Sequence, residues 1–199
     1  MAPVVVDPAK VKEFPTQADF YAWLKAHHDT DDEIWIRIFK KASGKPTISP
    51  VEAIDAVLCW GWIDAIRKSW DDESFVQRYT RRGKKSLWSQ INKDNVARLV
   101  DSGQMTEHGL RHVEVAKEDG RWDAAYSMAM DAPADLLAAL AASPTASAFY
   151  ATLSAQNRFA LIFRVHNLKT AAGRAKAIEK YVKMLERGET IYPQKPPKP

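Results

Sequence analysis

The strand patterns of this chain all lie before residue 92, and this distribution limits the fold more than any other feature. Before this point the segment 33–41 is apolar on both faces, with Ile34, Ile36 and Ile38 alternating along one of them, which is typical of a central strand. Beyond it, apolar residues recur at helical spacing. We therefore expect an α+β protein: a small antiparallel sheet of about three strands in the N-terminal half, packed by helices, and a helical C-terminal half.

Two further strand patterns, separated by the polar segment 71–74, predict a β-hairpin. If Trp70 pairs with Phe75, the register places Asp64 opposite Arg81. A single bulge in either strand would shift this register, because each inserted residue changes which side chains face each other.

Residues that favour helix N-termini mark where the helices begin. The expected caps of the first four helices are Thr16, Ser49, Asn92 and Thr106. The clearest helical pattern covers residues 171–187. Its apolar stripe consists of Ala171, Ala175, Ile178, Val182 and Leu185.

The length of 199 residues predicts a single globular domain over residues 1–190, followed by a flexible proline-rich tail over 191–199. The only cysteine, Cys59, rules out an intramolecular disulfide. No apolar run approaches the roughly 20 residues that span a bilayer, and the N-terminus lacks the pattern of a secretory signal. We therefore expect a cytoplasmic protein without membrane insertion.

Most familiar cofactor and catalytic motifs are absent. The chain has no dinucleotide or Walker-type phosphate loop, no His-Glu-x-x-His or Cys-x-x-Cys, and no Gly-x-Ser-x-Gly. His108 and His112 have metal-ligand spacing on a predicted helix, but an exposed helix surface is the favoured interpretation. We expect no cofactor and no metal, and a buried structural role for Cys59.

The segment 78–85 carries five cations in eight positions, a pattern that attracts anions or is simply solvated. Around it, residues 59–92 contain four tryptophans, the carboxylate of Asp64 and two serines close to Trp88. Arginine donors and tryptophan walls predict an anion-binding site. A secondary core, with Asp64 and Arg81 as a cross-strand ion pair, explains the same residues, so both interpretations stay open.

These pieces resemble the bacterial bacteriocin-protection, YdeI or OmpD-associated family, over about residues 14–189. The matching pieces include Arg78-Tyr79-Thr80 with Arg82, Gly120-Arg121-Trp122 and Ala125-Tyr126. Two others are specific in combination: Gly61-Trp62-Ile63-Asp64, and Ser86 with Trp88-Ser89 and Asn92. The chain departs from the family pattern at Ala65, at Arg81 and at Ala172-Gly173, so Arg82 is the better carrier of the family's arginine.

The resemblance implies protection against antimicrobial peptides and envelope stress, and association with an outer-membrane porin. It implies no reaction and no catalytic residue, so the leading hypothesis is a stress-protection protein that binds a small anionic ligand. The candidate ligand-binding residues are Trp62, Asp64, Arg78, Arg82, Ser86, Trp88, Asn92 and Lys41.

Two other functions fit the same residues. The basic hairpin end with interleaved aromatic residues is compatible with nucleic-acid binding, although a net charge of +4 is mild for that role. Asp64 could alternatively serve as the acid or base of an enzyme acting on a small anion. The sequence favours a protein that is not an enzyme, because no recognisable catalytic constellation is present.

Overall fold

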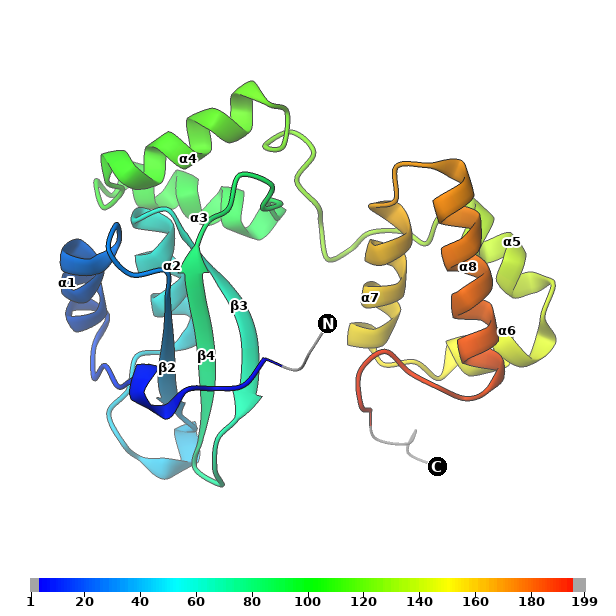
Figure 1. Cartoon of the computed structure of the whole chain (residues 1–199), viewed down its shortest axis with the longest axis horizontal. Coiled ribbons are helices and arrows are strands. Elements are labelled where there is room, and N and C mark those ends of the chain that lie inside the picture. The colour runs from blue at the N-terminus through cyan, green and yellow to red at the C-terminus, as the bar shows by residue number, and fades with distance from the viewer. Residues whose placement is uncertain (1–3, 195–199) are drawn as a thin grey trace. The chain divides into compact units, whose positions relative to one another are not determined.

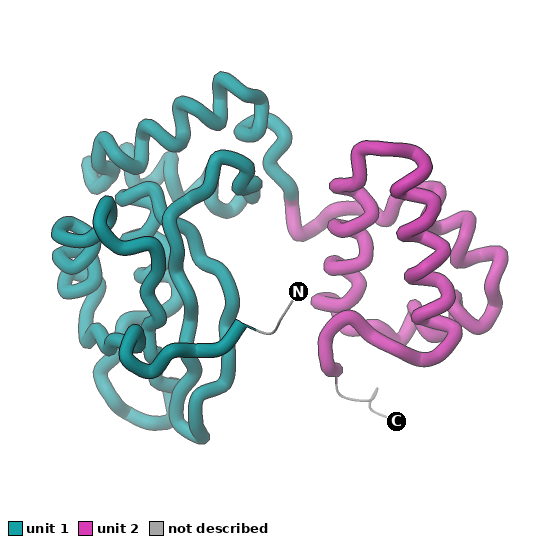
Figure 2. Tube along the Cα trace, viewed as in Figure 1, with its two compact units in different colours: residues 1–126 teal, residues 127–199 magenta. Residues whose placement is uncertain are grey.

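The computed structural model describes residues 4–194. The chain forms two compact units, residues 1–126 (unit 1) and 127–199 (unit 2), coloured separately in Figure 2. The sequence predicted one globular domain over residues 1–190, and within that range each unit has its own cluster of buried apolar residues.

Unit 1 contains a four-stranded sheet in the order β1-β2-β4-β3. Its strands are β1 (Val11–Lys12), β2 (Glu33–Phe39), β3 (Trp62–Ser69) and β4 (Ser74–Arg81). The α+β class is confirmed, with one strand more than expected. The sheet is mixed rather than purely antiparallel, because the two-residue strand β1 pairs parallel with β2.

Strand β2 lies between β1 and β4 and is buried on both faces, as its pattern predicted. Ile34, Ile36 and Ile38 are at most 1% exposed and belong to the core of unit 1. Trp35 faces the other way and is equally buried.

Four helices complete unit 1: α1 (Gln17–His27), α2 (Pro50–Cys59), α3 (Gln90–Asp101) and α4 (Glu107–Glu118). Figure 1 shows α3 and α4 near the end of the sheet where β3 begins and β4 ends. Thr16, Ser49 and Thr106 cap their helices as predicted. The third cap is a correction: Ser89, not Asn92, accepts the hydrogen bond, and its donor is the backbone N–H of Asn92.

The hairpin register also differs from the prediction. Ser69, rather than Trp70, pairs with Phe75, and an irregularity between Asp64 and Arg67 shifts the ladder. As a result Asp64 lies opposite Tyr79 instead of Arg81. The bulge therefore decides which residues surround the candidate carboxylate.

Unit 2 is entirely helical within its described residues, with α5 (Ala134–Ala141), α6 (Pro144–Ala151), α7 (Ala155–His166) and α8 (Ala171–Glu186). Leu136, Leu161 and Leu185 are fully buried at its centre. In residues 4–194 no helix combines the length and the apolar character needed to cross a membrane.

The predicted tail begins in an anchored segment. Asn157, 1% exposed, donates to the backbone oxygen of Tyr192 at 2.9 Å and to the side chain of Gln194 at 3.0 Å. These bonds hold the chain as far as Gln194, and the rest of the predicted flexible tail lies outside the described residues.

Candidate functional site

Arg82 is the centre of the candidate site because it is a buried cation. It follows β4, its backbone N–H donates to Gly61 at 3.0 Å, and it is only 4% exposed. Its guanidinium carbon lies 3.7 Å from the centre of the Trp88 ring, a cation–π stack. One guanidinium nitrogen, Nη1, donates to the Leu87 carbonyl at 3.1 Å. The other, Nη2, is buried and has no hydrogen-bond partner among the described residues.

Other buried polar atoms of unit 1 also lack partners within residues 4–194, among them the donors of Trp88 and Tyr79. Trp88 is 2% exposed and its indole Nε1 makes no hydrogen bond, while its ring contacts Trp122 edge to face at 4.8 Å. Tyr79 is fully buried, and its hydroxyl is likewise unpartnered. Burial, and then the charge of Asp64, raise the pKa of that hydroxyl. Such orphaned donors are rare in folded proteins and call for an explanation.

Asp64 supplies the negative charge next to these donors. Because it pairs with Tyr79 across the hairpin, the two side chains lie on the same face of the sheet. The residue is exposed on the edge strand β3, yet neighbouring groups crowd its carboxyl. The resulting loss of hydration raises its pKa, and a backbone hydrogen bond together with attraction to Arg82 and Arg67 offsets only part of that rise.

The surroundings of Arg82 are electropositive. Burial lowers the pKa of Arg82 to about 10, and Arg121 acts in the same direction, against the pull of Asp64. Burial is also the largest cause of the lowered pKa of His112, and repulsion from Arg82, Arg111 and Arg121 lowers that pKa further. The site therefore holds more positive than negative charge.

Tyr126, the last residue of unit 1, also contributes to the site. Its backbone N–H donates to Trp88 at 3.0 Å, and its carbonyl accepts from Gln90 at 2.8 Å. Burial raises the pKa of its hydroxyl, as does the charge of Asp64, while Arg82 and a hydrogen bond with Ser89 act in the opposite direction. We name the Arg82 cluster by its five members, Asp64, Tyr79, Arg82, Trp88 and Tyr126.

Of the eight residues predicted from sequence, Asp64, Arg82 and Trp88 belong to this cluster. Trp62 lies on the same face but serves the core: it is 1% exposed, and its Nε1 donates to the His28 carbonyl at 3.0 Å. Its ring meets Trp23 edge to face.

Ser86 and Asn92 shape the loop between β4 and α3. The hydroxyl of Ser86 accepts from the backbone of Gly83 at 3.0 Å, and its carbonyl accepts from Arg121 at 2.9 Å. Asn92 contributes its backbone N–H to the Ser89 cap at 3.2 Å. Both residues position the segment that carries Trp88.

The structure separates Arg78 and Lys41 from the cluster. Arg78 lies on the opposite face of the sheet from Tyr79, because successive strand residues alternate, and it forms an ion pair with Glu33. Lys41 is exposed beyond the end of β2. The eight residues of β4 rise about 25 Å between that end and Arg82.

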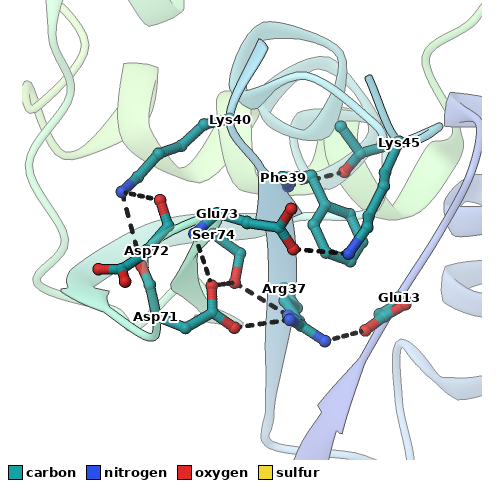
Figure 3. A network of polar contacts seen from close by, with 10 residues as sticks. Glu13, Arg37, Phe39, Lys40, Lys45, Asp71, Asp72, Glu73 and Ser74 are labelled. Atoms are coloured by element: carbon teal, nitrogen blue, oxygen red, sulfur yellow. Dashed lines mark hydrogen bonds and ion pairs between the residues drawn. The ribbon is translucent and has the colours of Figure 1, made fainter. Parts of the chain in front are cut away.

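The Lys41 end of the sheet carries its own polar network (Figure 3). Arg37 donates to Asp71 at 2.6 Å and to Glu13 at 2.9 Å, and Lys45 pairs with Glu73 at 2.6 Å. Because these charges pair with one another, they hold the turn between β3 and β4 in a fixed structure.

Two of the five cations in the basic segment 78–85 have acidic partners. Arg78 pairs with Glu33, and Arg81 donates to the Asp31 carbonyl at 2.8 Å and lies 3.6 Å from Asp32. Lys84 and Lys85 are exposed and make no hydrogen bond or ion pair within the described chain.

Metal and thiol chemistry find no support in residues 4–194. No group of three or more histidine, cysteine, aspartate or glutamate side chains could hold a metal ion there. Cys59 is 1% exposed, and burial raises the pKa of its thiol to about 12, so the thiolate needed for nucleophilic attack is suppressed.

Tyr79, His112, Arg121 and Tyr126 were not among the predicted site residues. Sequence spacing could not place the last three near Arg82, because they come from a later part of the chain. A signal nevertheless existed, because Arg78-Tyr79-Thr80, Gly120-Arg121-Trp122 and Ala125-Tyr126 are among the pieces that carried the family resemblance.

Residues 12–112 match the family model described as "Domain of unknown function (DUF8412)", which covers just over half of the chain. The chain belongs to this family. The DUF8412 match lies entirely within unit 1 and includes four of the five members of the Arg82 cluster. Its description states no activity.

Residues 129–188 match the model described as "Bacteriocin-protection, YdeI or OmpD-Associated". The resemblance is confirmed, but over a shorter stretch than residues 14–189, and this match lies entirely within unit 2. Its description suggests a role of the bacteriocin-protection type. No curated protein and no solved structure matches the chain.

Proposed function

We propose that this DUF8412 protein acts in bacterial stress protection by binding, and that the Arg82 cluster of unit 1 holds an anionic group of the ligand. The family match of unit 2 supports the biological role. The properties of Arg82 support the mode of action. Association with a porin and a cytoplasmic location stay predictions.

One observation carries the anion proposal: Arg82 is a buried cation without a carboxylate in ion-pair contact. It is 4% exposed and keeps one guanidinium nitrogen unpartnered within residues 4–194. Buried charges are normally paired, because an uncompensated charge in the interior is costly. An anion that accepts from Nη2 would supply the missing charge and the missing hydrogen bond. The indole N–H of Trp88, whose ring stacks on Arg82, offers a further donor.

Nucleic-acid binding has weaker support. It would need a row of free cations for phosphate contacts, whereas Arg78 and Arg81 already have acidic or carbonyl partners and Arg82 is buried. Lys84 and Lys85 alone would form a small footprint.

The test is titration of the full chain with inorganic phosphate, sulfate and acetate, followed by intrinsic tryptophan fluorescence. Trp88 stacks on Arg82, so occupancy should change the emission. We expect a saturable response in the wild type that Arg82→Met abolishes and Arg81→Met retains. The matched variants remove the same charge from neighbouring positions, one buried and one exposed. An equal response in both variants, or none in the wild type, contradicts the proposal.

The raised pKa of Asp64 favours a second candidate, an enzyme that uses this carboxyl as an acid or base. Asp64→Asn separates the two functions in cells challenged with a bacteriocin. If the protein acts by binding, this variant should keep protection as well as the fluorescence response. Loss of protection with anion binding intact would favour catalysis.

A further inference from the structure

Unit 2 contains an apolar groove of about 590 Å³ between α5 and α8. Its floor consists of small or aliphatic side chains from both helices: Ala139, Ala142, Ala171, Ala175, Ile178 and Val182. Five charged residues complete the lining, and their charges are largely satisfied within unit 2: Arg174 pairs with Asp135, Lys183 pairs with Glu179, and Glu186 accepts a hydrogen bond from Ser143. The groove lies within unit 2, outside the Arg82 cluster and outside the DUF8412 match.

The groove exists because unit 2 covers only part of the apolar stripe on α8. Ile178 and Leu185 are buried, at 7% and 0% exposure, whereas Ala171 and Ala175 are exposed. A stripe that continues beyond the core is a face without a partner.

The shape of the groove fits a helix. Its lining recurs at every turn of α8 from Ala171 to Glu186, a length of about 24 Å. The alanines on both walls leave room for another backbone to approach closely, so a rod of about four turns can lie along the groove.

The charge beside the groove selects the partner. Lys176, Lys180, Lys183 and Arg187 form an exposed stripe along α8 at i, i+4, i+7 and i+11, which places them on one face of the helix. Lys183 pairs with Glu179 and Arg187 with Glu189. Lys176 and Lys180 make no hydrogen bond or ion pair within the described chain.

This local excess reflects the composition of the unit. Residues 127–199 hold ten basic and five acidic side chains, whereas residues 1–126 hold 19 and 20. The positive charge of the chain is therefore concentrated in the unit that carries the groove.

We infer that the α5–α8 groove binds an amphipathic helix of a partner protein, with small or aliphatic residues on the buried face and acidic residues on the flank facing Lys176 and Lys180. This is the helix-in-groove mode of recognition, in which apolar anchors at i, i+3 or i+4 and i+7 give affinity. Complementary charge gives the orientation of the helix and the association rate.

The probe is a synthetic peptide of about 18 residues with leucine and alanine on one face and glutamate on the flanks. Its partner in the assay is the full chain, and binding is followed by fluorescence anisotropy of a label on the peptide. We expect saturable binding, at least tenfold weaker for a matched peptide in which lysine replaces every glutamate. Equal binding of the two peptides, or no binding of either, overturns the inference.

Two matched pairs of variants locate the site. Ala175→Trp fills the groove and should weaken binding at least tenfold, whereas Ala148→Trp, at an exposed alanine of α6, should not. Lys176→Glu with Lys180→Glu should weaken binding of the acidic peptide, and Lys25→Glu in unit 1 should not. Far-UV circular dichroism shows whether Ala175→Trp perturbs the fold. If it does, the lysine variants still test the inference. Equal effects within both pairs overturn the inference.

The same variants distinguish other occupants of the groove. If the wild type is a dimer by analytical ultracentrifugation and Ala175→Trp converts it to a monomer, the groove holds a second copy of this chain and the inference is wrong. Arg82→Met should leave peptide binding unchanged, so the anion site and the groove are tested independently.

Discussion

Both units bury polar side chains, but within residues 4–194 only unit 1 leaves some of their buried polar atoms without a partner. In unit 2, Asn157 has partners for its amide nitrogen and for its oxygen, because Tyr192 and Gln194 close around it. In unit 1, buried donors of Tyr79, Arg82 and Trp88 have no partner among the described residues. Unit 2 uses its buried amide to anchor its own C-terminal segment, whereas unit 1 leaves these donors unsatisfied within the described chain.

The apolar surfaces show the reverse contrast. Unit 1 surrounds its sheet with a large aromatic core that includes Phe20, Trp62 and Tyr79, whereas unit 2 leaves the apolar groove along α8 uncovered. A small anion suits the first arrangement and a helical partner the second. The two family matches, one within each unit, are consistent with two recognition tasks in one chain.

The largest expected effect tests whether unit 1 can unfold without unit 2. A Cβ at Gly109 would lie 2.5 Å from the Cys59 carbonyl oxygen and 2.6 Å from that of Leu58. Both are backbone atoms that cannot move aside, so Gly109→Val should cost about 3 kcal/mol or more. All seven tryptophans lie in unit 1, so the tryptophan fluorescence midpoint in urea measures this loss directly.

The control for this variant is Gly83→Ala, whose new Cβ would meet only the Ser86 hydroxyl, at 3.6 Å. Far-UV circular dichroism should retain the helical signal of unit 2 in Gly109→Val. If that signal is lost together with the tryptophan signal, the chain behaves as the single domain predicted over residues 1–190, and the comparison of two independent units fails.

The reciprocal experiment removes core volume from unit 2. Leu161 is fully buried, and Leu161→Ala should destabilise the unit by about 2–5 kcal/mol through lost burial and a residual cavity. Circular dichroism at 222 nm should show an earlier helical transition, and the tryptophan midpoint should stay in place. Leu137→Ala, at a leucine 48% exposed, is the matched control. A shift of the tryptophan midpoint would mean that the units are coupled.

Smaller effects are expected at matched helix caps. Ser49 forms a capping box with Glu52 at the start of α2, and Thr170 caps α8 through the backbone of Gly173. Ser49→Ala and Thr170→Ala should each cost about 1 kcal/mol. Each should move the midpoint of its own unit alone, measured by tryptophan fluorescence and circular dichroism respectively. A cap variant that shifts both midpoints would argue against the division into units.

Caps and strands could be predicted because they depend on short segments. Thr16, Ser49 and Thr106 need only their own helix, and the apolar alternation of β2 needs only its own residues. The missed cap has an equally local cause. Ser89 and Asn92 are both good caps, three residues apart, and Asn92 provides the N–H that Ser89 accepts.

The site was only partly predictable because it depends on long-range geometry. Asp64, Arg82 and Trp88 could be grouped from the sequence because one hairpin and one loop bring them together. The bulge after Asp64 then moved that carboxylate opposite Tyr79, which no local pattern indicates. The direction of β4 places Lys41 at the opposite end of the sheet from Arg82. The pairing of Arg78 with Glu33 depends on which face of each strand the two side chains occupy, and that was not known from the sequence.

The last prediction compares one carboxyl from each unit as pH changes. In unit 2 a hydrogen bond from Arg174 lowers the pKa of Asp135. Its contribution to stability is present at neutral pH and is lost as pH falls through the folded-state pKa. In unit 1 the loss of hydration raises the pKa of Asp64, so its ionisation weakens the fold as pH rises above the ordinary value of about 3.9.

The asparagine variants should therefore move in opposite directions. At pH 7 Asp64→Asn should melt above the wild type in tryptophan fluorescence, and Asp135→Asn should melt below it in circular dichroism. The difference at Asp64 should vanish toward about pH 3, where this carboxyl is protonated like its amide replacement. The difference at Asp135 should vanish only at still lower pH, because the pKa of that carboxyl lies below its ordinary value. If Asp64→Asn instead melts below the wild type at pH 7, then Asp64 already acts as the counterion of Arg82. The charge that the proposed anion would neutralise is then supplied by the chain itself, and unit 1 loses its reason to bind one.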